Sequence, residues 1–209
     1  MATIANMAAF ALVSFGLVLT PGPNMIYLIS RSILQGRRAG FISLLGVIAG
    51  FVFYMLCAAF GVSALMFAIP FAFRTIQIAG AAYLLYLAWK AVRPGAGSVF
   101  QPRTDLSVDG PRRLFMMGFL TNLLNPKIAL LYMSLLPQFL DVGRGGVVVQ
   151  SLSLGAVQIL VSFVVNLAIV LAASSVARWF NMRPGWVKVQ RWAMASVLSA
   201  LGVSVFYTG

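Results

Sequence analysis

The 209-residue sequence contains no histidine and no glutamate, and only three aspartates and one cysteine, Cys57. A metal site with histidine and cysteine ligands is therefore excluded, and so is a disulfide within the chain. Three aspartates also give little support to hydrolysis by a pair of carboxylates. We expect neither a metal ion nor a cofactor.

Charged residues of both signs are scarce, at 9% of the chain, whereas a soluble domain usually has about 25%. Hydrophobic residues make up 61%, and the mean hydropathy is +0.97. Too little polar surface remains to cover a water-soluble globule, so lipid must surround most of the chain. The length suits one compact unit rather than several.

The net charge is +12, which in a soluble protein would suggest nucleic-acid binding. Here the basic residues lie in short clusters between long apolar runs and form no stripe with interleaved aromatic residues. This pattern is typical of membrane topology signals. We therefore expect a lipid bilayer as partner and no nucleic acid.

Six segments approach the 20 or so apolar residues that a spanning helix needs. They predict an all-α integral membrane protein with spans at residues 7–29, 41–60, 75–91, 114–140, 147–173 and 187–207. Residues 62–73 are apolar but too short to span, and Pro70 interrupts them, so we expect an interfacial or re-entrant connection. Five spans remain the alternative. Residues 1–209 then form one transmembrane domain, with repeats at about 7–92 and 114–207 and a polar loop at 93–113.

The lysine and arginine residues are distributed unequally between the predicted connections. Arg74 and Arg144 fall on one side of the membrane. The other side, in the connections after the first, third and fifth spans, holds Arg31, Arg37, Arg38, Lys90, Arg93, Arg103, Arg112, Arg113, Arg178, Arg183, Lys188 and Arg191. Because cytoplasmic loops are enriched in basic residues, we predict that these three connections are cytoplasmic and that both termini are outside.

Two predicted spans contain proline within their apolar runs, at residues 20–24 and 121–127. Proline cannot bond to the carbonyl four residues before it, so these spans should be broken. Pro21 and Pro23 free the carbonyls of Leu17 and Leu19, and Pro126 frees that of Asn122; in lipid such a carbonyl needs another partner or a cavity.

Each predicted break lies in the first span of a three-span half. A half with an odd number of spans inserts inverted relative to its copy, so we predict two inverted repeats whose broken first helices meet near the membrane midplane. Two independent proline kinks are the alternative.

Lys127 is the only ionisable side chain deep within a predicted span, where a charge is costly. Three arrangements are open: the amine is neutral, it bonds to carbonyls freed at the breaks, or it faces a wet cavity that receives an anionic group of a substrate. A lysine that only caps broken backbone is the alternative to a functional role. For coupling to a proton, the candidates are Lys127 and Asp141, which lies at the outer end of the fourth span.

Other polar or small residues within the spans have simpler interpretations. Single Ser and Asn residues usually bond between helices, and we interpret Ser134 and Asn166 in this way. Gly46 and Gly50 form a GxxxG pattern, which predicts close packing of two helices.

Several short motifs together resemble those of the lysine-exporter/homoserine–threonine-resistance (LysE/RhtB) family of bacterial amino-acid exporters. They are TPGPN at residues 20–24, GRRAG at 36–40, AGAAYL at 79–84, NPK at 125–127 and LPQF at 136–139. The resemblance covers nearly the whole chain and implies an inner-membrane exporter driven by the membrane potential or a proton gradient. The family's fifth span often carries an acidic residue, whereas this chain has Gln158 and Ser162 there.

A zwitterionic amino acid needs N–H groups or a cation for its carboxylate, and oxygen acceptors for its ammonium group. Half-helices that begin after Pro23 and Pro126 should present free N–H groups, and Lys127 adds a charge. The predicted substrate-binding residues are Pro21, Gly22, Pro23, Asn24, Asn122, Asn125, Pro126 and Lys127.

A basic side chain would find no intramembrane carboxylate, so we expect a neutral or small polar substrate such as threonine or homoserine. A small-solute or ion channel is the alternative. An intramembrane hydrolase using Ser134 and Lys127 is remote, because seven residues of helix separate them by about 10 Å. The sequence leaves proton coupling and homo-oligomer formation open.

Overall fold

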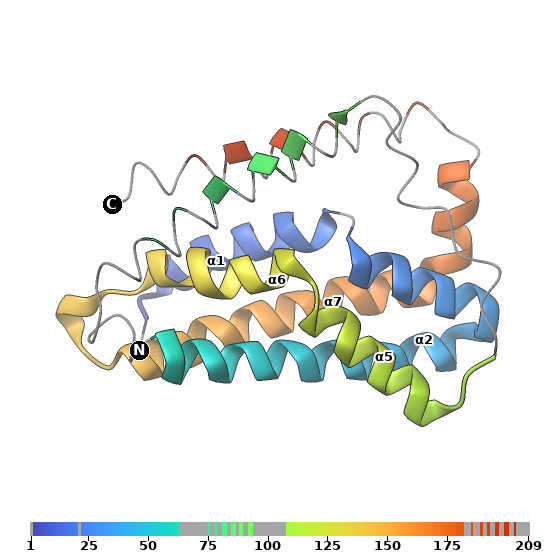
Figure 1. The fold of residues 1–209 in the computed structure, drawn as a ribbon, viewed down its shortest axis with the longest axis horizontal. Helices are drawn as coiled ribbons and strands as arrows, with labels where there is room; N and C mark the ends of the chain where they lie inside the picture. Colours follow the sequence, from blue (N-terminus) through green and yellow to red (C-terminus); the bar gives the residue numbers. More distant parts are fainter. Residues whose placement is uncertain are drawn as a thin grey trace.

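The structure, a computed structural model, describes residues 2–20, 22–62 and 108–181, with scattered residues between 75 and 93 and between 185 and 203. These residues are almost all helical and include no strand, which confirms the all-α class. In Figure 1 the elements are α1 (Ile4–Leu19), α2 (Pro23–Cys57), η1 (Ala58–Val62), α5 (Pro111–Leu123), α6 (Pro126–Leu130), η2 (Leu131–Leu135), η3 (Leu136–Phe139), η4 (Val142–Arg144) and α7 (Val147–Asn181).

Helix α1 begins and ends at threonines. The Thr3 hydroxyl accepts a hydrogen bond from the backbone N–H of Asn6 and so caps the first turn. At the other end, the backbone N–H of Thr20 bonds back into the helix, and its hydroxyl donates to the carbonyl of Gly16. Gly22 is extended and Pro23 opens the next helix, a position where its missing N–H costs nothing. The first predicted span is therefore broken, as expected.

Helix α2 is two antiparallel legs, residues 23–35 and 37–57, joined at Gly36. The dihedral angles of Gly36 (φ 82°, ψ 173°) lie in a region that only glycine adopts readily, and the chain reverses there (Figure 1). The legs contact each other, because the Ser43 hydroxyl donates to the Tyr27 hydroxyl at 3.2 Å. The first predicted span thus extends past residue 29, and the second begins before residue 41, since no residue other than Gly36 breaks the helix here.

The fourth predicted span is broken as well. Helix α5 ends at Leu123, α6 begins at Pro126, and the segments Pro111–Leu123 and Pro126–Phe139 meet at an angle of 52°. The helix starts at Pro111 rather than at Leu114, because proline is well suited to the first helical position. Both predicted breaks are therefore present.

The distribution of polar and apolar residues on helix α7 is opposite to that on a helix of a soluble protein, because α7 buries polar residues and exposes apolar ones. Its exposed side carries Val149, Leu160, Val164 and Leu171. Its buried side carries Gln150, Ser151, Leu154, Gln158, Ser162, Asn166 and Val170. Apolar side chains on the outer surface are the arrangement that a lipid environment requires, and the polar side chains lie inside, where other protein groups can bond to them.

Among the described residues, two helical segments are long and apolar enough to span a membrane, Pro23–Gly61 and Val147–Ala173. The first of them comprises both legs of α2, with the reversal at Gly36, and most of η1. The bent segment from Pro111 to Phe139 is a third if it counts as one span. These findings support a helical membrane protein, whereas the six-span count and the inverted repeats stay predictions. The predicted spans at 75–91 and 187–207 and the connection at 62–73 fall largely outside the described residues.

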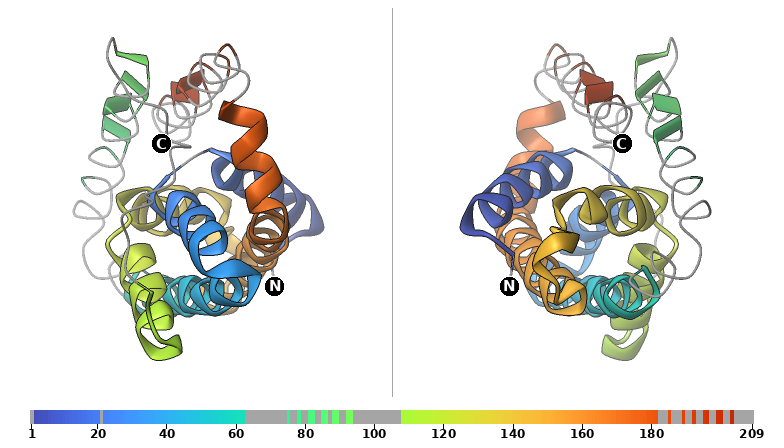
Figure 2. Two further views of the ribbon diagram at one scale, coloured as in Figure 1. Left: turned by 90° about the vertical axis from the view of Figure 1, so that its right-hand side faces the viewer. Right: turned by 90° about the vertical axis from the view of Figure 1, so that its left-hand side faces the viewer.

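The helices run lengthwise as one bundle, which Figure 2 shows end-on. The second leg of α2 packs against both α5 and α7. A Cβ atom at Gly46 would overlap the backbone of Phe115, and one at Gly118 would overlap the backbone of Ser43. A Cβ atom at Gly50 would lie 2.7 Å from the Cβ atom of Asn122. The close packing predicted for Gly46 and Gly50 is therefore confirmed.

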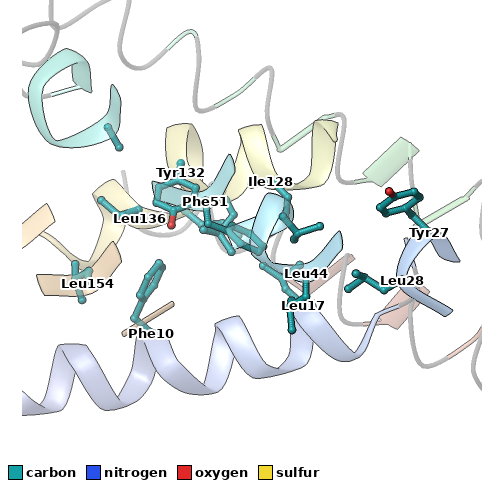
Figure 3. Packing of buried hydrophobic residues seen from close by; sticks show 14 of the residues in the cluster. Phe10, Leu17, Tyr27, Leu28, Leu44, Phe51, Ile128, Tyr132, Leu136 and Leu154 are labelled. Atoms are coloured by element: carbon teal, nitrogen blue, oxygen red, sulfur yellow. The ribbon is translucent and has the colours of Figure 1, made fainter. Parts of the chain in front are cut away.

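The apolar core follows the length of this bundle. Figure 3 shows Phe10, Leu136 and Leu154 at one end and Tyr27 and Leu28 at the other. Between these ends Leu17 of α1 and Ile128 of α6 lie close together, so the ends of the two broken helices meet within the core.

Candidate functional site

Lys127, the second residue of α6, joins the two helix breaks. Its Nζ atom donates to the carbonyl oxygen of Leu17 at 2.9 Å and to that of Thr20 at 2.7 Å. Both acceptors lie at the end of α1. Pro21 cannot donate to the Leu17 carbonyl as the next helical residue would, and Thr20 follows Leu19, the last residue of the helix. Of the three arrangements that the sequence left open for Lys127, the structure shows the bond to carbonyls at a helix break. The sequence predicted free carbonyls at Leu17 and Leu19, and the observed acceptors are the carbonyls of Leu17 and Thr20.

The backbone N–H groups at the start of α6 are hydrogen-bonded to Asn125, the residue just before the helix. The Asn125 side chain accepts from the backbone N–H of Lys127 at 3.1 Å, and the Asn125 carbonyl accepts from Ile128 and Ala129. The expectation of free N–H groups after Pro126 is therefore wrong, because Asn125 caps this helix. The predicted free carbonyl of Asn122 is also taken, since it accepts from the backbone N–H of Asn125 at 3.0 Å.

The start of α2 differs, because Gly22 provides no side-chain cap. Gly22, Asn24 and Met25 all line the cavity that Lys127 lines. A Cβ atom on Gly22 would lie 3.3 Å from the Lys127 Nζ atom, so only a glycine leaves the ammonium group this much space. The positive end of the α2 dipole and the ammonium group of Lys127 therefore lie side by side.

Three asparagines at the breaks have buried polar atoms without a hydrogen-bond partner. These atoms are Oδ1 of Asn24, both side-chain polar atoms of Asn122, and Nδ2 of Asn125. Their residues are 7%, 0% and 1% exposed, respectively. An unpaired buried polar group costs about 1–3 kcal/mol, so these three asparagines are polar groups that a water molecule or a ligand could satisfy.

The cavity at the breaks measures about 20 Å³ in this conformation. That is close to the space of a single water molecule. Four lining residues are polar, and we call them the polar wall: Asn24, Lys127, Gln158 and Asn166. The other described lining residues are mostly apolar, and we call them the apolar wall: Leu17, Val18, Gly22, Met25, Phe51, Ile128 and Leu131.

A chain of hydrogen bonds along α7 supports the polar wall. The Tyr132 hydroxyl donates to Gln158 Oε1 at 2.6 Å, and Gln158 Nε2 donates to the Ser162 hydroxyl at 2.7 Å. Asn166 Nδ2 donates to the Ser162 carbonyl at 2.8 Å. The interpretation of Asn166 as a bond between helices is therefore wrong, because this bond lies within α7. In the sequence, the spacing of four residues between positions 158, 162 and 166 indicated that these side chains lie on the same face of a helix.

Three other predicted residues, Pro23, Pro126 and Asp141, are not among the described residues that line the cavity. Pro23 and Pro126 start the helices after the two breaks, and Pro21 falls outside the described residues. Asp141 lies between η3 and η4, where it pairs with Arg144 at 3.0 Å and bonds through its backbone to the Gln150 side chain. Its side chain is 42% exposed, so Asp141 has the setting of a surface residue.

Comparison with known proteins gives one consistent result. The sequence profile of the LysE type translocator family matches residues 15–209. A leucine efflux protein of Salmonella typhimurium is 30% identical over 83% of this chain and 81% of its own length. An uncharacterized membrane protein of Pseudomonas aeruginosa is 31% identical over 79% of this chain and 78% of its own length. One of Bacillus subtilis is 28% identical over 84% and 87%, respectively. No solved structure matches the chain.

Proposed function

Because the chain belongs to the LysE type translocator family, we propose that it exports amino acids across the bacterial inner membrane. The observation that carries this proposal is Lys127, whose ammonium group joins two broken helices beside a small cavity with polar and apolar lining residues. Broken helices that meet at a binding site are a recurrent design of secondary transporters. In our proposal the connections holding Arg31, Arg113 and Arg178 face the cytoplasm, and both termini face outward.

The carboxylate of the substrate binds between Lys127 and the start of α2. An ammonium group has three N–H donors, and Lys127 uses two of them on the carbonyls of Leu17 and Thr20. The remaining donor and the uncapped first turn of α2 can then hold a carboxylate. The unpaired Asn24 Oδ1 atom is a suitable acceptor for the ammonium group of the substrate.

The side chain of the substrate faces the apolar wall. This wall includes Val18, Met25, Phe51 and Leu131, and no carboxylate is among the described residues that line the cavity. A basic side chain would be desolvated there without a partner, which is costly. We therefore propose a neutral substrate, aliphatic such as leucine or small and polar such as threonine or homoserine. The names of the leucine efflux relatives support a neutral substrate.

Binding requires the cavity to grow. Ligand pockets usually measure about 300–1,000 Å³, far more than the 20 Å³ of this conformation. The cavity lies between the end of α1 and the start of α6, and the bonds of Lys127 hold these two ends together. We propose that these ends move apart as the substrate enters, and that the substrate carboxylate then takes the third N–H donor of Lys127. If a proton is coupled to export, Lys127 is our candidate for carrying it.

The test is export by cells that lack their own exporters and express this protein. Cells loaded with dipeptides should release leucine or threonine faster than matched cells without the protein, with saturation and against a concentration gradient. Lysine should leave at the background rate. Release that never exceeds equilibrium would indicate a channel, and preferential lysine release would overturn the proposed substrate class.

A further inference from the structure

A second buried cluster lies away from the cavity and has no part in the proposed binding site. It comprises Tyr27, Arg31 and Gln35 of α2 and Asp109, which lies just before α5; we call it the inner polar cluster. Arg31 forms an ion pair with Asp109, and their side chains are only 2% and 1% exposed. The sequence alone placed Arg31 among the topology signals and Asp109 in a polar loop.

The inner polar cluster joins two segments that are distant in sequence. Gln35 donates to the backbone carbonyl of Asp109 at 2.9 Å and accepts from Arg31 at 2.9 Å. The Tyr27 hydroxyl donates to the carbonyl of Leu114 at 2.8 Å, so a second layer of bonds lies above the ion pair. The first leg of α2 is therefore fixed to the start of α5 over two helical turns.

The position of the cluster relative to the cavity follows from helix geometry. Asn24 and Met25 line the cavity, and Arg31 lies on the same leg of α2. Seven residues of α-helix span about 10 Å, so the ion pair lies about 10 Å from the cavity along this helix. Figure 3 shows Tyr27, a member of this cluster, on the far side of Ile128 from Phe10, at one end of the core. By the proposed topology, this end is cytoplasmic.

The opposite end is closed differently. There α1 contacts η3 through the Phe10 and Phe139 rings, whose centroids are 5.0 Å apart, and through Asn6 Nδ2, which donates to the Phe139 carbonyl. No charged side chain takes part in these two contacts. The two ends of the core therefore differ, with an ion pair on the inner side and aromatic packing on the outer side.

We propose that the Arg31–Asp109 pair is the inner gate of the transporter and must separate in each cycle to admit substrate from the cytoplasm. This inference rests on the proposed function. An ion pair suits this purpose because its two charges are stable in two states: paired when dry, and separately hydrated when the entrance fills with water. Separation of the first leg of α2 from α5 opens a route to Asn24 and Lys127.

Cross-linking across the gate tests the proposal. In a Cys57→Ala background, Gln35→Cys and Val108→Cys place one thiol on each side; Val108 is exposed and adjoins Asp109. A bifunctional methanethiosulfonate reagent then joins the two segments, and dithiothreitol releases them. We expect at least a tenfold loss of export after cross-linking and recovery after reduction. The two single-cysteine variants, treated identically, are the matched controls, and treatment should leave each at the export rate that the same variant had before it.

Cross-linked protein that exports at the rate of the reduced protein would overturn the gate, because the segments would then not need to separate. A second measurement needs no transport. In Val18→Cys protein in the Cys57→Ala background, which carries its one thiol on the cavity wall, Asp109→Asn should raise the labelling rate by an impermeant thiol reagent about tenfold in inside-out vesicles. Asp109 also pairs with the exposed Arg113 at 3.1 Å, and Arg113→Gln, which removes this exposed pair and leaves the buried one, should not raise the rate. An unchanged rate in Asp109→Asn would contradict the proposal.

The two proposals fail separately. If wild-type protein exports no amino acid, the proposed function fails, while the labelling rates still report whether the Arg31–Asp109 pair closes the cytoplasmic entrance. If export is normal and neither cross-linking nor Asp109→Asn has an effect, the gate fails and the exporter remains.

Discussion

The Nζ atom of Lys127 lies 2.7 Å from the carbonyl oxygen of Thr20, although 107 residues separate them in the sequence. The same atom also bonds to the carbonyl of Leu17, which further accepts from the backbone N–H of Thr20 at 3.2 Å, so one side chain bonds to two carbonyls at the end of α1. This contact makes the two breaks interdependent. A change at either break should therefore affect the other.

Lys127→Ala removes both of these bonds and the charge beside the start of α2. Hydrogen bonds to charged groups contribute about 1.5–3 kcal/mol each, and about 1.4 kcal/mol is a factor of ten. We expect export to fall at least tenfold while the protein still inserts. Membrane yield and export from loaded cells are measured together. Full export by this variant would remove Lys127 from the mechanism.

Gln158→Glu places a carboxylate on the cavity wall. Glutamate keeps the oxygen that accepts from Tyr132 and loses the amide that donates to Ser162. Because the cavity then offers an anionic partner to a second cation, we expect the ratio of lysine to leucine export to rise about tenfold, using the conversion of about 1.4 kcal/mol per tenfold change. Ser162→Ala is the matched control for the lost hydrogen bond. Active Gln158→Glu protein with the wild-type ratio would contradict the proposed substrate class.

Gly46→Ala tests the close packing of α2 on α5. The added methyl group would overlap the Phe115 backbone, which cannot move as a side chain end can. Overpacking of this kind costs about 1–3 kcal/mol. We expect a lower midpoint of thermal unfolding in detergent. Gly61→Ala is the control, because no atom of the described residues lies within 4 Å of the added Cβ atom there; equal midpoints for the two variants would argue against the packing described.

Asp141→Asn tests the other residue that the sequence suggested for coupling. Asp141 and Arg144 have side chains 42% and 64% exposed, and exposed ion pairs contribute about 0–1 kcal/mol. We expect export within twofold of wild type at all pH values at which the wild type is active. A complete loss of proton-driven export with normal membrane yield would instead make Asp141 the coupling residue.

The sequence predicted the two breaks because proline acts locally: wherever it occurs within a helix, it removes the hydrogen bond to the carbonyl four residues before it. Pro23, Pro126 and Gly36 each start or end a helix in the structure. The Asn-Pro pair at residues 125–126 carried a further signal, since asparagine before a first-position proline is a typical helix cap. The expectation of free N–H groups after Pro126 was wrong because Asn125 was assigned to substrate binding, whereas its side chain accepts from the backbone N–H of Lys127.

The ion pair between Arg31 and Asp109 could not be predicted in the same way. Each residue has a sufficient explanation in its own segment, one as a topology signal and the other as part of a polar loop. Their pairing depends on where the first leg of α2 ends relative to α5, which is set by the turn at Gly36 and by the glycine contacts of Gly46 and Gly118. Tertiary packing of this kind leaves no periodic pattern in the sequence.

The bond from Lys127 to α1 has a consequence for biogenesis. During synthesis α1 emerges first, and the carbonyls of Leu17 and Thr20 must wait for more than a hundred further residues before the lysine reaches them. Until then the Thr20 carbonyl needs another partner such as water, because bare carbonyls are costly in lipid, whereas the Leu17 carbonyl already accepts from the backbone N–H of Thr20. The end of α1 therefore gains its bonds to Lys127 only after α6 has been synthesised.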